Sequence, residues 1–271
     1  NGPPLPPIWL SMRHWQPLSS PLHLSREQVR ELWPRLHRGD TEPCPQAEDL
    51  LQAWTLFHRG EFEAAVERGL SLTAKGQHAA WTLVNRATAV YANYMEPQES
   101  LRLSLLEQAA EQARMHTELQ PDNPNAWYLW AYSLGRYAQG ISVAKALAQG
   151  MGARVRDALE KTIALNPAHS DAKFALATFH AEVIDKVGEL IARMTHGARK
   201  DLGLALYAEA YAHNPSSLVG MLEMAKGLVM LEGDAQQARA HTLYQQVSGA
   251  VATDALEHLV VALAQATLSD L

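Results

Sequence analysis

Histidine performs acid–base chemistry and binds metals near neutral pH, and this chain contains 12 histidines. The densest group of such residues is His169, Asp171, His180 and Glu182. His169 and His180 are 11 residues apart, so on a straight helix they lie about three turns apart and cannot bind one metal ion. No HExxH motif or other ligand pair at close helical spacing is present. We therefore expect solvated or locally hydrogen-bonded histidines, with no metal and no cofactor.

The single cysteine, Cys44, is the other side chain with nucleophilic chemistry. It lies in the segment Thr-Glu-Pro-Cys-Pro, where no neighbouring base could convert the thiol to the reactive thiolate. One thiol can form neither an intrachain disulfide nor a structural zinc site. Taken with the histidine spacing, these features predict that the chain is not an enzyme.

The tripeptide Gly-Ala-Arg occurs twice and ends at Arg154 and Arg199. Arginines next to helix N-termini could form an anion site with the first backbone amides. The alternative is that Asp157 and Asp201 neutralise them at the surface, since a helix N-terminus disfavours cations. We expect neutralisation. The preceding QGMGA is too short and lacks the lysine of a phosphate-binding P-loop.

The charge balance argues against nucleic acid as a partner. The chain carries 23 basic and 29 acidic residues and a formal net charge of -6, whereas binding to phosphates requires a concentrated basic surface. No apolar run approaches the roughly 20 residues that span a bilayer, so we expect no transmembrane segment. Because the sequence starts at Asn1, a signal peptide removed upstream is compatible with it, and the compartment is either cytoplasmic or periplasmic.

From about residue 46 onward, the pattern is helical. Between residues 155 and 183, apolar residues recur at the i, i+3, i+4, i+7 spacing of an amphipathic helix, and runs that alternate strictly like a strand are absent. Three helices should stop before Pro121, Pro167 and Pro215, which are 46 and 48 residues apart. A regular period of this size is typical of a helical repeat protein, so the fold class is all-α.

Three segments resemble the tetratricopeptide repeat (TPR) family. GEFEAAVERGLSL (residues 60–72) and GDAQQARAHTLYQQ (residues 233–246) are similar to the second helix of a TPR unit, and NAWYLWAYSLG (residues 125–135) is similar to the first. The resemblance implies a right-handed α-solenoid of about five antiparallel helix pairs, with a capping helix at about 253–268.

The central units are longer than the family's unit of about 34 residues. The additional residues lie at 140–154 and 183–199, between the two helices of a pair. Either an extended first helix or an extra short helix, followed by a glycine stop, would account for both insertions.

In TPR arrays the first helices of the pairs line a concave groove that binds partners, so the resemblance implies a set of binding residues. Their register is anchored on Trp127, Gly60 and Trp81. The candidate binding residues are Trp54, His58, Arg86, Tyr128, Tyr132, Arg136, Phe174 and Thr178. Aromatic residues and arginine are typical of binding hot spots. The alternative is that these aromatic residues pack between adjacent helix pairs.

The predicted function is that of a non-catalytic scaffold that binds a protein or peptide in this groove. The lysine–arginine–asparagine clamp with which some TPR domains bind chaperone C-termini is absent, and only Arg136 provides a cation in the corresponding region. An apolar segment or a small apolar ligand with one anionic group would suit the groove. In the alternative, the longer units resemble the periplasmic TPR accessory proteins of bacterial TRAP-type transporters, which implies a small apolar or anionic ligand.

Residues 1–45 are expected to form an extended, proline-rich arm with one short helix, and residues 46–271 to form the repeat domain. Ser25 and Gln28 resemble a capping box that starts the short helix, and Trp33-Pro34 should limit it. The arm contains Ile8, Trp9, Leu10 and Trp15, so it either packs on its own domain or docks on another subunit to form a homo-oligomer.

Overall fold

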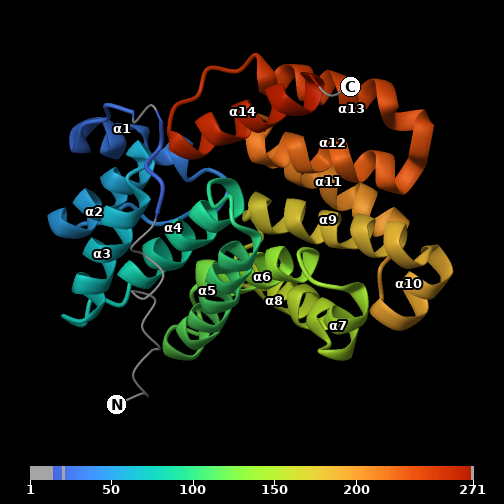
Figure 1. Cartoon of the computed structure of the whole chain (residues 1–271), viewed down its shortest axis with the longest axis horizontal. Helices are drawn as coiled ribbons and strands as arrows, with labels where there is room; N and C mark the ends of the chain where they lie inside the picture. Colours follow the sequence, from blue (N-terminus) through green and yellow to red (C-terminus); the bar gives the residue numbers. More distant parts are fainter. Residues whose placement is uncertain (1–14, 20–21, 270–271) are drawn as a thin grey trace. The chain divides into compact units, whose positions relative to one another are not determined.

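The computed structural model of the protein describes residues 15–19 and 22–269 (Figure 1). Within these ranges the chain forms helices joined by turns and loops, with no strand, which confirms the all-α prediction. None of the described helices combines the length and the hydropathy needed to cross a membrane. The part of the expected extended arm at residues 1–14 lies outside the described residues.

The described chain divides into two compact units. The first contains the described residues up to Trp33 together with Glu42–Lys161, and the second contains Pro34–Thr41 together with the residues from Thr162 onward. The short segment Pro34–Thr41 therefore belongs to a different unit from the residues on either side of it.

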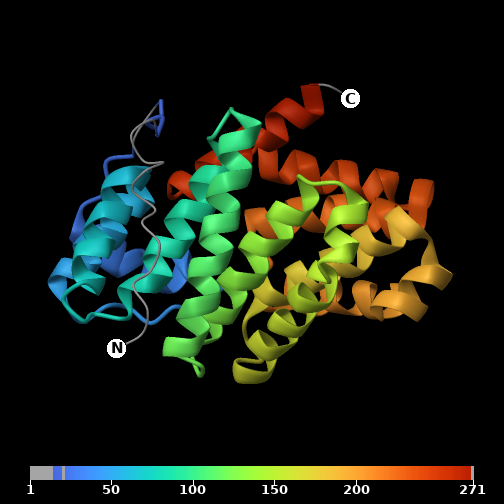
Figure 2. The ribbon, with the colours of Figure 1, turned by 60° about the horizontal axis from the view of Figure 1, so that its bottom comes forward.

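In the first unit, the helices from α2 to α7 each pack on the next one along the chain, and α4 also packs on both α2 and α6. Figure 2 shows α5 and α6, in two shades of green, side by side over most of their length. The helices are α1 (Arg26–Leu36), α2 (Glu48–Arg59), α3 (Phe62–Thr73), α4 (Ala80–Tyr94), α5 (Glu99–Leu119), α6 (Pro124–Gln139), α7 (Val143–Ala148) and α8 (Met151–Leu165). Helix α1 belongs to this unit up to Trp33, and α8 up to Lys161.

In the second unit, α9 packs on α10, α11 and α12, and α12 packs on α11, α13 and α14. Its helices are α9 (Ser170–Val187), α10 (Glu189–His196), α11 (Lys200–His213), α12 (Leu218–Glu232), the 3₁₀ helix η3 (Gly233–Gln236), α13 (Gln237–Ser248) and α14 (Ala255–Ser269). The observed α14 agrees with the helix expected at about 253–268.

The predicted proline stops are confirmed. Helix α5 ends two residues before Pro121, α8 two residues before Pro167, and α11 two residues before Pro215. In each case the proline and the conformational restriction it places on the preceding residue end the helix.

Each insertion contains an extra short helix, α7 or α10, as one of the two alternatives predicted. Gly197 ends α10 in the left-handed conformation, with φ of 66°, which confirms the glycine stop there. At the other insertion the left-handed residue is Gly150, with φ of 60°, and Gly152-Ala153-Arg154 lies in the first turn of α8. The stop expected at Gly152 is therefore two residues earlier.

Helix α1 begins with the predicted capping box. The backbone N–H of Ser25 donates to Oε1 of Gln28 (2.7 Å), and the N–H of Gln28 donates to Oγ of Ser25 (3.1 Å). The helix then continues through Pro34 to Leu36 instead of stopping at Trp33-Pro34. Proline disfavours this continuation. The buried side chains of Val29 and Trp33 hold the preceding turn in place, so tertiary packing outweighs the local preference.

Replacing Ser25 with alanine should destabilise α1 by about 1 kcal/mol, because the Gln28 amide loses its acceptor. Faster amide hydrogen exchange in the first turn of α1, together with urea unfolding, would measure the effect. Ser71→Ala is the matched control, since Ser71 is exposed inside α3 and caps no helix. Equal effects of the two substitutions would contradict the prediction.

Candidate functional site

Four of the predicted binding residues form a continuous row in the first unit. The guanidinium carbon of Arg86 lies 5.9 Å from the centre of the Tyr128 ring. Tyr128 and Tyr132 follow with ring centres 6.1 Å apart, and the guanidinium carbon of Arg136 lies 5.2 Å from the Tyr132 ring. Arginine over an aromatic face is a favourable cation–π arrangement. We call these four residues the arginine–tyrosine row.

The row follows from helix geometry. Tyr128, Tyr132 and Arg136 are four residues apart on α6, so they share one side of the helix. Helix α4 packs on α6 and supplies Arg86 at one end of the row. Helix α6 itself is well defined at its start, where the Asn123 side chain accepts a hydrogen bond from the Asn125 amide and Pro124 occupies the first turn.

The two ends of the row differ in exposure. Arg86 and Tyr128 are each only 8% exposed, whereas Tyr132 and Arg136 are half-buried. Arg136 also donates a hydrogen bond from Nη1 to Oε1 of Gln139 (3.2 Å). A partner can therefore reach Tyr132 and Arg136, while Arg86 and Tyr128 support them from the interior.

Trp54 and His58, by contrast, lie in the core of the first unit. Trp33 of α1 covers both of them, with ring centres 5.5 Å from Trp54 and 6.0 Å from His58 in edge-to-face geometry. The Trp33 indole N–H donates to the carbonyl of Glu42 (2.8 Å), which fixes the ring over α2. These two residues were expected on a groove, and α1 occupies the side of α2 on which they lie.

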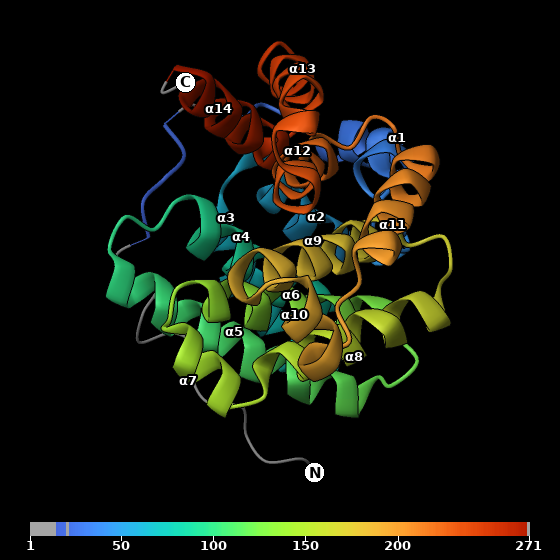
Figure 3. The ribbon, with the colours of Figure 1, turned by 90° about the vertical axis from the view of Figure 1, so that its right-hand side faces the viewer.

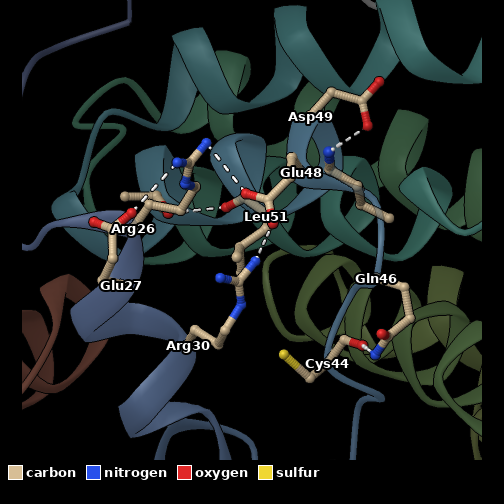
Figure 4. A network of polar contacts seen from close by, with 10 residues as sticks. Arg26, Glu27, Arg30, Cys44, Gln46, Glu48, Asp49 and Leu51 are labelled. Atoms are coloured by element: carbon tan, nitrogen blue, oxygen red, sulfur yellow. Dashed lines mark hydrogen bonds and ion pairs between the residues drawn. The ribbon is translucent and has the colours of Figure 1, made fainter.

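Polar contacts fasten α1 to α2, as Figure 4 shows. Glu48 at the start of α2 forms ion pairs with Arg26 (3.2 Å) and with Arg30. Arg59 at the other end of α2 donates from Nε to the carbonyl of Leu24 (2.6 Å). Helix α1 is thus tied to the start of α2, and the chain just before α1 is tied to the end of α2, which explains why Trp33 stays over Trp54.

Cys44 also lies close to this network in Figure 4. Partial burial raises the pKa of the Cys44 thiol, and the charge of Arg30 opposes that rise. A raised pKa favours the thiol over the nucleophilic thiolate.

Phe174 and Thr178 belong to the second unit, where Phe174 is buried and Thr178 is half-buried. The Phe174 ring lies so close to Gly220 of α12 that a Cβ atom there would come within 2.3 Å of it. The hydroxyl of Thr178 is hydrogen-bonded to that of Tyr207 on α11 (2.9 Å). Phe174 thus packs between adjacent helices, which was the alternative interpretation for the aromatic residues.

The two histidines of the densest sequence group accept hydrogen bonds from backbone amides, of which that of His169 is local. His169 is buried and accepts from the Ala172 amide (3.1 Å), which caps α9, and buried His180 accepts from the Arg199 amide (3.3 Å). Within the described residues, no three His, Cys, Asp or Glu side chains lie close enough together to hold a metal ion.

Of the two arginines that end the Gly-Ala-Arg tripeptides, Arg199 is paired with Asp201 as expected, whereas Asp157 pairs with the neighbouring Arg156 and not with Arg154. Arg156 donates from Nη2 to Asp157 (2.8 Å), and Arg199 donates from Nε to Asp201 (3.1 Å). The hydrogen bond from Arg199 lowers the pKa of the Asp201 carboxyl. Arg154 instead donates to the backbone carbonyl of Gln149 (3.2 Å).

The packing of Pro34–Thr41 was not predicted from the sequence, which assigned this segment to the extended arm. Within the second unit, the carbonyl of Gly39 accepts from the Asp171 amide (3.2 Å), and the Asn166 side chain donates to Thr41. His37 and Asp40 form a buried pair, with Nδ1 and Oδ1 3.0 Å apart. The apolar residues Val29 and Trp33, four residues apart, are a signal in the sequence that α1 packs on the first unit, and this signal does not extend to Pro34–Thr41.

Comparison of the chain with protein-family models and with curated proteins finds no match.

Proposed function

We propose that the protein is a non-catalytic interaction module built as a TPR-like α-solenoid, and that Tyr132 and Arg136 on α6 bind a polypeptide segment. The helix order supports this architecture. The pairs are α2 with α3, α4 with α5, α6 with α8, α9 with α11 and α12 with α13, while α14 is the capping helix and α7 and α10 are insertions.

The packing of every second helix favours this assignment. In a stacked array of helix pairs, the first helix of one pair contacts the first helix of the next. The contacts of α4 with α2 and α6 follow that pattern in the first unit, as does the contact of α9 with α12 in the second.

The arginine–tyrosine row is the observation that carries the binding proposal. Tyrosine offers a large contact area at a low entropic cost, and arginine is enriched at hot spots of protein interfaces. Tyr132 and Arg136 are accessible, and the aromatic and cation–π contacts along the row hold them in place before binding. A segment with an apolar or aromatic side chain next to a carboxylate fits this pair, since the ring packs on Tyr132 and the carboxylate pairs with Arg136.

Peptides selected from a random display library against the intact chain would test this proposal. Arg136→Ala and Tyr132→Ala should each weaken the selected peptides at least about tenfold, which corresponds to about 1.4 kcal/mol. Arg114→Ala is the matched control, because Arg114 is a solvated arginine of α5 that pairs with Glu111 and Glu118. Selected peptides that bind both α6 variants as tightly as the original protein would contradict the assignment.

A small apolar ligand with one anionic group is the second candidate function, in keeping with the resemblance to transporter accessory proteins. The burial of Arg86 and Tyr128 favours it, because the row extends inward beyond the reach of a surface-bound peptide. Native mass spectrometry of the purified chain distinguishes the two functions. A small molecule that stays bound to the original protein and is lost in Arg86→Ala supports the small-ligand function. A chain that carries no small molecule and binds the selected peptides supports the polypeptide-binding function.

A further inference from the structure

Helix α10 presents an exposed apolar patch. Leu190, Ile191 and Met194 are 72%, 54% and 77% exposed, and they account for three of the seven large apolar side chains that are exposed in the described part of the chain. Figure 3 is viewed with α10 toward the reader. Single exposed apolar residues are ordinary, but three within five residues of one short helix form a contiguous patch.

The structure holds α10 firmly with this patch outward. Ala192, on the opposite side of the helix, is fully buried, and α10 packs on α9. Gly188 and Gly197, with φ of 80° and 66°, turn the chain at the two ends of the helix. The amide of Ala198 donates to the carbonyl of Ala192 (3.1 Å), so the C-terminal turn is also closed. The exposure therefore belongs to an ordered helix and not to a frayed one.

The charges of α10 are arranged in a self-complementary way. Glu189 lies in the first turn and Arg193 in the last turn, four residues apart, so both flank the patch on the same side. Both are exposed, and neither forms an ion pair within the described residues. When two such helices run antiparallel, the acidic start of each lies beside the basic end of the other. The two helix dipoles then point in opposite directions, which is also favourable.

We propose that α10 is a self-association surface, on which two copies of the chain pair their α10 helices in antiparallel orientation about a two-fold axis near Ile191. Leu190 of each copy packs against Met194 of the other. Glu189 of each copy pairs with Arg193 of the other, because a two-fold axis keeps the same flank of both helices on one side.

The same charges disfavour a lipid surface as the occupant. A helix that lies on an anionic membrane carries mainly Lys and Arg on its polar face. Here Glu189 directly flanks the patch, and the chain as a whole has a net charge of -6, which anionic headgroups repel.

The dimer should be weak. A stable protein interface buries about 800 Å² on each partner, and a helix of two turns provides less than that. We therefore expect a reversible dimer with a Kd on the order of tens of micromolar.

Sedimentation velocity of the full chain between about 5 and about 500 µM tests the proposal, because the weight-average mass should rise with concentration in that range. Leu190→Gln combined with Met194→Gln should weaken the dimer at least about tenfold. Val251→Gln is the matched control, since Val251 is 87% exposed in the turn after α13 and should leave the dimer intact.

Charge reversal tests the antiparallel register. Glu189→Arg and Arg193→Glu should each weaken self-association, because like charges then meet across the axis. An equimolar mixture of the two variants should dimerise at least as well as the original chain, since one variant supplies two cations and the other two anions. No structural role of α10 within a single chain would produce recovery on mixing.

Three outcomes would overturn the proposal. The first is a monomer throughout the concentration range, and the second is a dimer that the glutamine variant leaves unchanged. The third is a monomer that binds phosphatidylglycerol vesicles through the patch, which would assign α10 to a membrane surface instead.

Discussion

Lowering the pH from about 6.5 to about 4 should destabilise the protein by about 3 kcal/mol more than it destabilises a His116→Leu variant. Burial in α5 lowers the pKa of His116 from its ordinary value near 6.5 to about 4. The hydrogen bond between its Nε2 and Gln120 (2.8 Å) opposes this shift, and the nearby His78 adds to it. A buried imidazole is thus held neutral, because its charged form would lose hydration.

The direction of the change in stability with pH follows from the number of protons bound by the folded and the unfolded states. In the unfolded chain His116 becomes protonated below pH 6.5, whereas in the folded chain it becomes protonated only near pH 4. The unfolded state therefore binds more protons in this window, so the stability contributed by His116 is complete above pH 6.5 and is lost as the pH falls.

Urea unfolding at a series of pH values measures the difference. All seven tryptophans precede Arg136, so none belongs to the second unit, and tryptophan fluorescence follows the first unit, which contains His116. The gap between the two stability curves should widen by about 1.4 kcal/mol per pH unit below 6. Parallel curves for the original protein and His116→Leu would show that His116 does not titrate as its burial requires.

Gly227→Ala should destabilise the second unit by about 2 to 4 kcal/mol, although alanine is the better helix former. A Cβ atom at Gly227 would lie 1.9 Å from the Tyr207 hydroxyl oxygen and 2.6 Å from Cζ, and Tyr207 is fully buried. Overpacking costs about 1 to 3 kcal/mol. Displacing Tyr207 also weakens its hydrogen bonds with Thr178 (2.9 Å) and with the Glu223 carbonyl (3.3 Å), worth about 1 kcal/mol each. These losses exceed the gain of about 1 kcal/mol in helix propensity.

Gly135→Ala in α6 is the matched control. The nearest atom to a Cβ there is in Val155 at 3.9 Å, so the added methyl group fits and the helix should be stabilised by about 0.5 to 1 kcal/mol. Tyr207→Phe should offset part of the Gly227→Ala cost in a double-mutant cycle, because it removes the atom that is nearest to the new Cβ. Circular dichroism during thermal unfolding provides the readout. Equal effects of the two glycine substitutions would contradict the proposed clash.

The helix boundaries could be predicted from the sequence because they depend on short-range interactions. Pro121, Pro167 and Pro215 act on the residues immediately before them, and the capping box of Ser25 and Gln28 closes within one turn. Helix α1 continues past Pro34, where the sequence predicted its end. This difference has a long-range cause, since packing of the preceding turn of α1 outweighs the local preference for ending the helix.

The candidate site could be predicted only in part. Four-residue spacing on α6 was enough to bring Tyr128, Tyr132 and Arg136 together, because one helix determines that arrangement. The contact of Arg86 with Tyr128 additionally depends on the register between α4 and α6, which residue spacing within one helix does not give.

The amino-acid sequence by itself determined the helix ends before Pro121, Pro167 and Pro215 and which side chains share one side of a helix, since both depend on contacts within a few turns. Only the tertiary structure decided which of those sides reach solvent. Trp54 is buried because Trp33 of another helix lies against it, and Phe174 is buried because Gly220 lets its ring approach the α12 backbone. Burial depends on partners distant in sequence, and the spacing of residues within one helix does not identify those partners.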